Sequence, residues 1–539
     1  MVRKLIRPQD VMQSDSQLIT LEQADLMPLP YPYDNPESEP SFSPVKEAWK
    51  DKHCTTLDGF VGIDTLIRPD NKADEEKMVQ AFLRGMEKIL SEDTNRNWLQ
   101  PVLLSLEYCA KCNTCSDACH IFVASGGNEL YRPIFRSEVF RKLIKKYHTT
   151  GGRLLGAFVG ADVELNWEGM ARLAELAYRC NLCRRCAQTC PLGLDNALIA
   201  REIRKIFSQE LGIAPKPLHE KGTMLQLKTG SSTGITKPAL LDMLEFIEED
   251  IEEKTGKKIK FPLDKKGADI LLTHNAGEYM AWPENPAAFA ILFEEAGLDW
   301  TLSTDLIGYD NVNYGIWYDD FQARRVAEEQ FRAAKELGVK RIIIGECGHA
   351  HRAAAISMDR MVTSENYVPR ESCLPLLWDL VKTKRLKFDP SKNNFPVTLH
   401  DPCNVVRAMG IVQPQREILK AIAPGFREMT PNGVYNYCCG GGSGFAIMNS
   451  MNFSEFRNKV SCRMKFKQIL DAFKQEIGDV NTPKVVCAPC SNCKGSIRDI
   501  LEYYEATDKY NLQYTGLVEL MVNALVSIDK PYLEFLEED

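Results

Sequence analysis

Two stretches decide the fold: CAKCNTCSDAC at residues 109–119 and CNLCRRCAQTCP at residues 180–191. Both have the spacing C-x2-C-x2-C-x3-C, so eight of the 18 cysteines in this 539-residue chain stand in two copies of one pattern. Two-residue gaps in a short loop let three thiolate sulfurs converge on one iron–sulfur cluster, because such clusters take soft thiolate ligands. We therefore expect a domain built around two cubane [4Fe-4S] clusters.

The fourth cysteine of each stretch is expected to reach the cluster of the other stretch, as in the bacterial ferredoxin pattern. His120, rather than proline, follows the first stretch, and residues 120–179 separate the two, so we expect a more helical fold than a compact ferredoxin. A zinc site is the alternative, but zinc ligands usually come as two separated pairs. The sequence predicts two adjacent clusters that form an electron wire, one held by Cys109, Cys112, Cys115 and Cys190 and the other by Cys180, Cys183, Cys186 and Cys119.

Composition and charge exclude several classes of protein. Hydrophobic residues make up 44% and charged residues 26% of the chain, which is ordinary for a globular protein of two to four domains. A net charge of -8 argues against a non-specific nucleic-acid binder. No apolar run approaches ~18 residues and the N-terminus has no long apolar segment, so we expect neither a membrane span nor a secretory signal. A cytoplasmic location with reduced thiols follows.

The sequence changes character along the chain. A Pro-rich stretch, PLPYPYDNPESEPSFSP at residues 28–44, and a lone Cys54 mark the first part. Short apolar runs alternate with helical stretches after residue 265, which is typical of an α/β architecture. We predict an N-terminal arm or cap over residues 1–100, a helical ferredoxin-like domain over 101–212, a linker over 213–265, and two α/β halves over 266–395 and 396–539, the second ending in C-terminal helices.

The two α/β halves read as two copies of one unit. Three pairs of segments align: LLTHNAGEY (271–279) with VTLHDPCNV (397–405), NVNYG (311–315) with YNYCCG (435–440), and KRIIIGECGHA (340–350) with PKVVCAPCSNC (483–493). The first pair sets His274 against His400, and the third sets Cys347 against Cys490. Such copies would pack as pseudo-twofold halves with any shared site between them. The second half keeps its cysteines, whereas the first, degenerate half has lost most of them.

A second group of cysteines marks the intact half: Cys403, Cys438, Cys439, Cys487, Cys490 and Cys493. Two adjacent cysteines ligate two irons of one cluster only if that cluster is more open than a cubane. The glycines at 440–442 would let the backbone approach a metal closely. They do not form a phosphate loop of the usual kind, since no Gly-Lys-Ser/Thr follows them.

The motifs H-D-P-C, C-C-G-G-G and C-x-x-C-K resemble the CCG domain of heterodisulfide reductase catalytic subunits and their relatives. The two ferredoxin-type stretches are similar to the partner module of those enzymes, here placed in front on the same chain. The resemblance implies a non-cubane [4Fe-4S] cluster held by Cys403, Cys438, Cys439, Cys490 and Cys493. Cys490 and Cys493 fit the motif better than Cys487, although the gap after Cys439 is longer than usual in the family.

Four further cysteines remain to be assigned. Cys347 lies opposite Cys490 in the internal alignment, so it is a candidate cofactor-binding residue that faces the cluster across the pseudo-twofold. Whether Cys347 or Cys487 ligates the cluster stays open at this point. Cys373 and Cys462 are expected to be small buried hydrophobic residues.

The resemblance also implies the reaction and the partners. The expected substrate is the disulfide or trisulfide of a small DsrC-type sulfur carrier protein in sulfur metabolism, including sulfate reduction. Electrons are expected from quinol through a DsrM-like membrane cytochrome b subunit. The chain would then be attached to the inner face of the cell membrane through its partner subunits, as one part of a larger redox complex. VNYG stands where a first CCG motif is expected, so a mechanism that uses two non-cubane clusters lacks its second site.

Proton donors for such a reduction should be imidazoles or acids near the cluster. His400, three residues before Cys403, is the first candidate catalytic residue, and Glu346 is a lesser one. His349 and His351 are further candidates beside Cys347. The alternative for each histidine is a structural role that ties down a loop.

Two other functions compete with a disulfide or trisulfide reductase. One is an electron-transfer iron–sulfur subunit of a glycolate- or lactate-type oxidoreductase, which has no substrate chemistry of its own. The other is a scaffold held together by zinc. A basic run, RKLIKKYH at residues 141–148, either meets a partner or is a solvated helix face.

Overall fold

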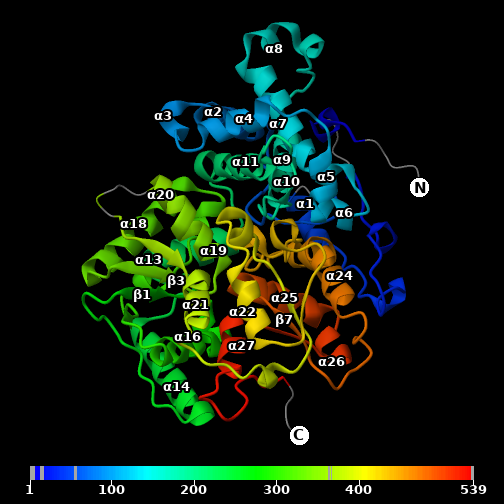
Figure 1. Ribbon diagram of the computed structural model, residues 1–539. Coiled ribbons are helices and arrows are strands. Elements are labelled where there is room, and N and C mark those ends of the chain that lie inside the picture. The colour runs from blue at the N-terminus through cyan, green and yellow to red at the C-terminus, as the bar shows by residue number, and fades with distance from the viewer. Residues whose placement is uncertain (1–5, 13–16, 54–56, 362–364, 366, 536–539) are drawn as a thin grey trace. The chain divides into compact units, whose positions relative to one another are not determined.

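The computed structural model describes residues 6–12, 17–53, 57–361, 365 and 367–535; Cys54 lies outside them. These residues form two compact units (Figure 1). The helical unit comprises the chain up to His219 together with Trp317–Asp320 and Gly440–Lys465. The α/β unit comprises Glu220–Ile316, Phe321–Cys439 and the chain from Phe466 onward. The finer division into five domains stays a prediction.

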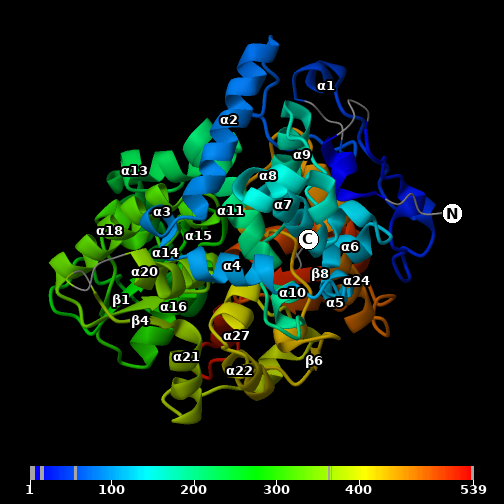
Figure 2. The same ribbon diagram turned by 90° about the horizontal axis from the view of Figure 1, so that it is seen from above.

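The helical unit is built around α11 (Asn196–Leu211). The Asp195 carboxylate caps its first turn by accepting hydrogen bonds from the N–H groups of Ala197 and Leu198, and Gly212, at φ +65°, ends it in the left-handed region. Four longer helices pack against α11 (Figure 2): α2 (Lys72–Ile89), α4 (Leu99–Glu107), α7 (Pro133–His148) and α9 (Trp167–Tyr178).

Short helices carry the two cysteine stretches and the remaining connections of this unit. They are α1 (Glu47–His53), α3 (Glu92–Asn95), α5 (Thr114–Ala118), α6 (His120–Ala124), α8 (Thr150–Leu155), α10 (Arg185–Gln188), α12 (Lys216–Leu218) and α23 (Phe453–Phe456). The backbone just before Cys180 is fixed by a buried ion network, in which Arg179 bonds Asp58 at 2.8 and 3.0 Å and Glu175 at 2.6 Å.

The α/β unit contains two parallel four-stranded sheets with the same strand order. The first runs β2 (Trp300–Thr301), β1 (Ile270–Thr273), β3 (Arg341–Ile344), β4 (Arg370–Ser372). The second runs β6 (Phe426–Glu428), β5 (Val397–Leu399), β7 (Lys484–Cys487), β8 (Leu512–Thr515). The prediction of a helical domain followed by α/β architecture is confirmed. The shared order agrees with two copies of one unit, and their pseudo-twofold arrangement stays a prediction.

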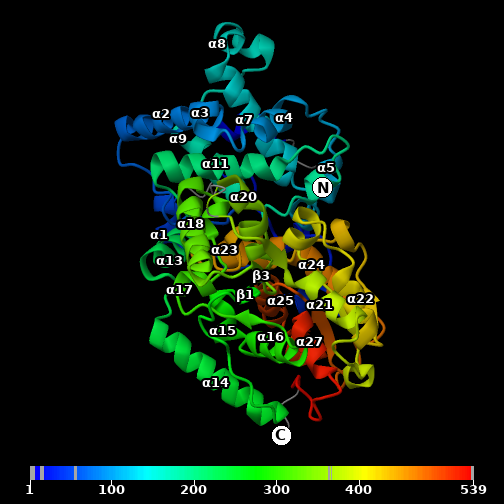
Figure 3. The ribbon, with the colours of Figure 1, turned by 60° about the vertical axis from the view of Figure 1, so that its left-hand side comes forward.

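One hydrophobic core runs through both halves of the α/β unit. Alternate residues of β1 point to opposite sides of its sheet, as the strand period requires: Ile270 and Leu272 face this core, whereas Leu271 packs on the side of α18 (Asp320–Leu337). Inside the core, α16 (Glu284–Glu295) of the first half packs against α27 (Leu517–Asn523) of the second (Figure 3). The two halves therefore form one folded body.

Several other helices complete the α/β unit. The region predicted as a linker contains α14 (Lys237–Thr255), whose Leu240, Leu244, Ile247 and Ile251 are buried in the shared core. The remaining helices include α15 (Ala276–Ala281), α19 (Gly348–Ala350), α21 (Cys373–Lys382), α22 (Pro414–Ile422), α24 (Arg463–Ala472) and α25 (Ser491–Tyr503). No described helix combines the length and the apolar character that crossing a bilayer requires.

The sheet order predicts where ligands bind. In each sheet the chain passes from the first strand to a neighbour at one edge, and then crosses back to the other side of the first strand for the third and fourth strands. The connections after the two middle strands thus run to opposite sides, and a crevice opens at the carboxyl ends of these strands. These ends are β1 and β3 in the first half and β5 and β7 in the second. His274 and His400 follow β1 and β5 directly, and Cys347 and Cys490 lie three residues after the ends of β3 and β7.

Candidate iron–sulfur centre

The backbone of the intact half presents His400 and Cys403 at the end of β5. The His400 N–H donates to the Cys487 carbonyl at 2.8 Å, which continues the ladder between β5 and β7. The next residue, Asp401, binds both terminal nitrogens of Arg416, at 2.7 and 2.6 Å, and accepts from the Gly433 N–H at 2.7 Å. Because these three groups are buried or nearly so, the turn that carries Cys403 is held rigidly.

Three side chains from three segments meet at this crevice. One ligand atom each of His400, Cys439 and Cys493 lies within 4.8 Å of the other two, and all three residues are buried. Hydrogen bonds from the neighbouring Cys438, Cys493 and His400 hold the pKa of the Cys439 thiol well below its usual range. The Ser496 hydroxyl donates to the Cys439 carbonyl at 3.0 Å and so fixes the pair to α25.

Cys490 is the next thiol of the group. Its side chain is hydrogen-bonded to the Cys493 thiol. The Cys490 sulfur also accepts a hydrogen bond from the Gly348 N–H at 3.2 Å. The backbone of Gly348 approaches the sulfur closely, because a β-carbon at this position would lie 3.0 Å from the Cys490 sulfur and would push on it. Cys403 is buried and begins the π-helical turn Asn404–Ala408.

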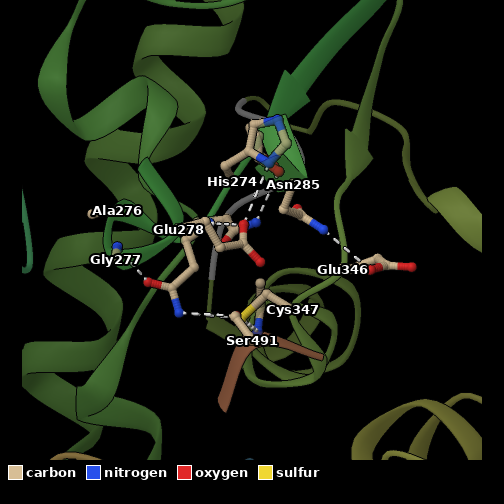
Figure 4. A network of polar contacts seen from close by, with 12 residues as sticks. His274, Ala276, Gly277, Glu278, Asn285, Glu346, Cys347 and Ser491 are labelled. Carbon is tan, nitrogen blue, oxygen red and sulfur yellow. Dashed lines mark hydrogen bonds and ion pairs between the residues drawn. The ribbon is translucent and has the colours of Figure 1, made fainter. Parts of the chain in front are cut away.

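Cys347 lies beside Cys490. Figure 4 shows the Cys347 side chain next to Ser491. Burial, and then the neighbouring Cys490 thiol, raise the pKa of Cys347 above its usual value. The Asn275 amide nitrogen lies 3.9 Å from the Cys347 sulfur and donates to the Ser491 hydroxyl at 3.1 Å. Cys487, by contrast, contributes its side chain to the shared hydrophobic core. Of the two cysteines left open by the sequence, Cys347 is therefore the one next to the thiol group.

Cys347 and Cys490 sit in the same local structure. The Cys347 N–H donates to the Gly345 carbonyl at 2.7 Å, and the Cys490 N–H donates to the Ala488 carbonyl at 2.6 Å. Each cysteine then begins a helix by accepting a backbone hydrogen bond from the residue four positions later, at 3.0 and 2.8 Å. The alignment of the two segments thus corresponds to equivalent turns at the ends of β3 and β7.

Glu346, His349 and His351 have structural contacts. The buried Glu346 carboxylate accepts from the Leu517 N–H at 2.9 Å, and burial raises its pKa well above the usual value. His349 contacts the Asn313 carbonyl at 2.9 Å, and His351 contacts the Cys347 carbonyl and the Ser372 hydroxyl, each at 2.7 Å. Burial lowers the pKa of both histidines to about 4, so they are neutral at pH 7. These contacts favour a structural role for His349 and His351, in which each imidazole ties down a loop, over a role as a proton donor.

The helical unit brings the eight ferredoxin-type cysteines into two groups of four. A small cavity is lined by Cys109, Cys112, Cys115 and Cys190. The second group is Cys119, Cys180, Cys183 and Cys186. Burial, then Asp195, then the neighbouring Cys180, Cys183 and Cys119 thiols raise the pKa of Cys186 well above its usual value. Burial raises the pKa of Cys119 to about 12. In both groups the fourth cysteine of one stretch lies with the first three of the other.

Both cysteine loops curl in the same way. Lys111 and Asn113 in the first stretch, and Leu182 and Arg184 in the second, have φ between +50° and +63°. These residues stand two and four positions after the first cysteine of each stretch. Left-handed residues between the cysteines turn successive side chains inward, so the loops suit convergent thiolate ligands.

Asn181, directly after Cys180, was not predicted from the sequence. The oxygen of its side-chain amide accepts from the Ser461 hydroxyl at 2.7 Å and lies 2.7 Å from His120 Nε2. The nitrogen of the same amide donates to the Gly440 carbonyl at 2.8 Å. Gly440 has φ +88°, and a β-carbon there would lie 2.5 Å from the Cys462 sulfur. The glycine after the Cys-Cys pair is thus required for packing against Cys462, which is buried as expected.

The residues present fit iron–sulfur clusters. The thirteen predicted ligands are thiols, none of them in a disulfide, and soft thiolates are the donors that such clusters take. Twelve of them stand in three groups of four, and Cys403 is buried after the end of β5. The Asn275, Ser491 and Asn181 contacts were missed because they connect segments far apart in the chain. For Asn275 a signal existed, since the internal alignment places it opposite the polar Asp401.

Two domain families match the chain. Residues 105–194 match the 4Fe-4S dicluster domain, and residues 397–498 match the cysteine-rich domain. The first range contains both ferredoxin-type stretches, and the second contains all five predicted ligands of the intact half. Fold and site together define an iron–sulfur oxidoreductase in which a 4Fe-4S dicluster domain precedes a cysteine-rich domain.

Relatives that align over most of the chain give a narrower description of this class of protein. The chain is 26% identical over 499 residues to an Hdr-like menaquinol oxidoreductase iron-sulfur subunit 2 of Archaeoglobus fulgidus, which covers 84% of each chain. It is 26% identical over 544 residues to an Hdr-like menaquinol oxidoreductase iron-sulfur subunit of Archaeoglobus profundus, covering 89% of this chain and 93% of the relative. The D polypeptide of the dihydromethanophenazine:CoB–CoM heterodisulfide reductase of Methanosarcina barkeri is 25% identical over 64% of this chain and 79% of its own. The predicted resemblance to heterodisulfide reductase subunits is confirmed.

Proposed function

We propose that the chain is the catalytic iron–sulfur subunit of a membrane-associated redox complex, of the kind called DsrK in the DsrMKJOP complex of sulfur metabolism. Electrons from quinol pass through a DsrM-like cytochrome b subunit, two cubane [4Fe-4S] clusters and a non-cubane [4Fe-4S] cluster. The reaction is the reduction of a disulfide or trisulfide on a DsrC-type carrier protein. The complex lies at the inner face of the cell membrane.

The names of the relatives support both ends of this electron path. Two of them are menaquinol oxidoreductase subunits and one belongs to a heterodisulfide reductase. A quinol donor and a disulfide acceptor are the substrates that these names state.

One observation carries the proposal: His400, Cys439 and Cys493 converge within 4.8 Å at the carboxyl edge of the second sheet. Together with Cys403, Cys438 and Cys490, these thiols would hold the non-cubane cluster, with Cys347 next to them. The eight cysteines of the helical unit would hold the two cubanes. When bound, the clusters supply electrons one at a time, and an open iron supplies a position for a substrate sulfur.

The residues of the chain supply placement and protons. Cleaving one S–S bond consumes two electrons and two protons and releases two thiols. His400 contacts Cys439, and imidazole is the side chain that changes its charge near neutral pH, so we assign His400 to deliver a proton to the leaving sulfur. The Asp401–Arg416 pair holds the His400 turn in place. Glu346, as a buried helix cap, is not needed for this step.

The test uses a substrate-bound state of the centre. Thiol treatment of the oxidised, iron-loaded protein should produce a new electron paramagnetic resonance signal, and Cys439→Ala should abolish that signal. Cys373→Ala is the matched control, because Cys373 is an equally buried cysteine of the same unit that packs in the hydrophobic core. If thiols produce no signal in the wild-type protein, the chain is an electron relay, as in the glycolate- or lactate-type alternative.

A further inference from the structure

The segment after α7 exposes an apolar tip. It consists of α8 and the following 3-10 turn, Gly156–Val159. Within five residues, Leu154, Leu155 and Phe158 are 79%, 54% and 97% exposed. A globular protein usually buries such side chains, and clustered exposure marks a surface that meets an apolar environment. We propose that this apolar tip, Leu154, Leu155 and Phe158, inserts into the headgroup region of an anionic lipid bilayer.

The tip stands at the end of a rigid support. Figures 1 and 3 show α8 beyond the C-terminal end of α7, away from the other helices of the helical unit. The support is anchored in its middle, where Val139, Phe140 and Leu143 of α7 are fully buried. α7 is 16 residues long, which corresponds to about 24 Å. The helix thus holds the tip clear of the surface that the rest of the unit presents.

Two cations flank the tip without an acidic partner. Lys145 donates to the Val159 carbonyl at 3.4 Å, and Arg153 donates to the Tyr147 carbonyl at 2.8 Å. Within the described part of the chain, neither side chain forms an ion pair with a carboxylate. Their neighbours Lys142 and Lys146 are neutralised by Asp162 and Glu164. An uncompensated positive charge beside apolar side chains, in a chain of net charge -8, complements an anionic membrane surface.

The size of the tip favours lipid over a protein partner. A stable protein interface buries about 800 Å² on each side, over some 20 to 30 residues. Three apolar side chains on two short turns do not provide such a surface. They do suit shallow insertion between lipid headgroups, where leucine and phenylalanine sit in the interface and Lys and Arg remain at its charged edge.

This inference goes beyond the proposed function, in which only partner subunits attach the chain to the membrane. Direct lipid contact by the tip would orient the helical unit at the bilayer before any partner protein docks. The contact is expected to be weak and reversible, because single shallow insertions give only marginal membrane binding. It does not depend on the reaction that the clusters perform.

Vesicle flotation of the full, iron-loaded chain tests the inference. The wild-type protein should float with vesicles of equal parts phosphatidylglycerol and phosphatidylcholine, and far less with phosphatidylcholine alone. The triple variant Leu154→Ser, Leu155→Ser and Phe158→Ser should lose most of this flotation, at least fivefold. A matched control replaces Phe246, Met280 and Val526 by Ser, since these residues are 61%, 62% and 54% exposed in the α/β unit. The control should float like the wild type.

A second pair of variants tests the charge. Lys145→Gln with Arg153→Gln should weaken flotation at low salt, whereas Lys258→Gln with Lys340→Gln, on exposed lysines of the α/β unit, should not. Iron content and the thiol-induced signal should be unchanged in all variants, which separates this inference from the proposed function. Equal flotation of wild type and tip variant would overturn it. The inference would also be overturned if the wild-type protein floated with neither vesicle type and the tip variant lost binding to a partner protein.

Discussion

The side-chain amide of Asn181 donates to the carbonyl of Gly440 at 2.8 Å, although 259 positions separate the two residues in the sequence. Asn181 follows the first cysteine of the second ferredoxin-type stretch, and Gly440 follows the Cys-Cys pair. The loop that carries cubane ligands and the glycine-rich segment are therefore parts of one hydrogen-bonded structure inside the helical unit.

Replacing Asn181 by Ala should destabilise the protein by about 3 kcal/mol, since the change leaves the buried Gly440 carbonyl, the Ser461 hydroxyl and His120 without this partner. Thermal unfolding of the anaerobic, iron-loaded protein measures the loss. Asn394→Ala, at an exposed asparagine, is the control and should change the midpoint little. An Asn181→Ala protein as stable as the control would show that the amide bridge contributes nothing.

The grouping of the cysteines predicts which variants share a phenotype. Cys190→Ala and Cys115→Ala should remove the same cubane signal in low-temperature electron paramagnetic resonance, because both residues line the first cavity. Cys119→Ala should remove the other signal, together with Cys186→Ala. Each variant should lose about four irons per chain. A shared phenotype of Cys190→Ala and Cys186→Ala would contradict the exchange of the fourth ligand.

Cys347 and Cys487 should behave differently. Cys347→Ser should alter the thiol-induced signal, since Cys347 lies beside Cys490. Cys487→Ser should leave the signal unchanged and instead reduce thermal stability, by about 1 to 2 kcal/mol, because its side chain belongs to the hydrophobic core. If instead Cys487→Ser altered the signal and Cys347→Ser did not, Cys487 rather than Cys347 would be the cysteine next to the centre.

Gly348→Ala should displace the Cys490 side chain by a steric clash, without removing any hydrogen-bonding or ligand group. The added methyl group would lie 3.0 Å from the Cys490 sulfur, which is too close for a normal contact. We expect a shifted thiol-induced signal with both cubane signals intact. Gly478→Ala is the matched control, since a β-carbon at Gly478 meets nothing within 4 Å. Identical spectra of the two variants would argue that Cys490 is not part of the centre.

Asp310 should make stability depend on pH in an unusual direction. Burial raises its pKa to about 6, above the ordinary value of 3.8. The folded state then binds a proton that the unfolded state has lost, so the contribution of Asp310 to stability is present below pH 4 and is lost as the pH rises to 6. The loss is about 3 kcal/mol. Urea unfolding of wild type and Asp310→Asn from pH 4 to 7 measures it as the difference between the two curves, and parallel curves would contradict it.

Much of the fold and the centre could be predicted because the motifs are local. The spacing of each ferredoxin-type stretch encodes its own loop, and the His400 and Cys490 positions follow directly from strand-to-helix turns. The helical character of residues 237–255 was missed, because a charged run hides the four apolar residues that α14 buries. Glu346 and Asn181 could not be assigned either. Their partners, Leu517 and Gly440, are brought near only by the tertiary fold.

The helical unit is assembled from three separate parts of the chain, up to His219, at Trp317–Asp320 and at Gly440–Lys465. No single scission point yields both units whole: a cut after residue 219 would leave the amide of Asn181 and the hydroxyl of Ser461 on different polypeptides. Expression of either unit alone should therefore require a grafted or circularly rearranged gene. The two units of this molecule are therefore interleaved along one chain, so a truncation that removes part of one unit also disrupts the other.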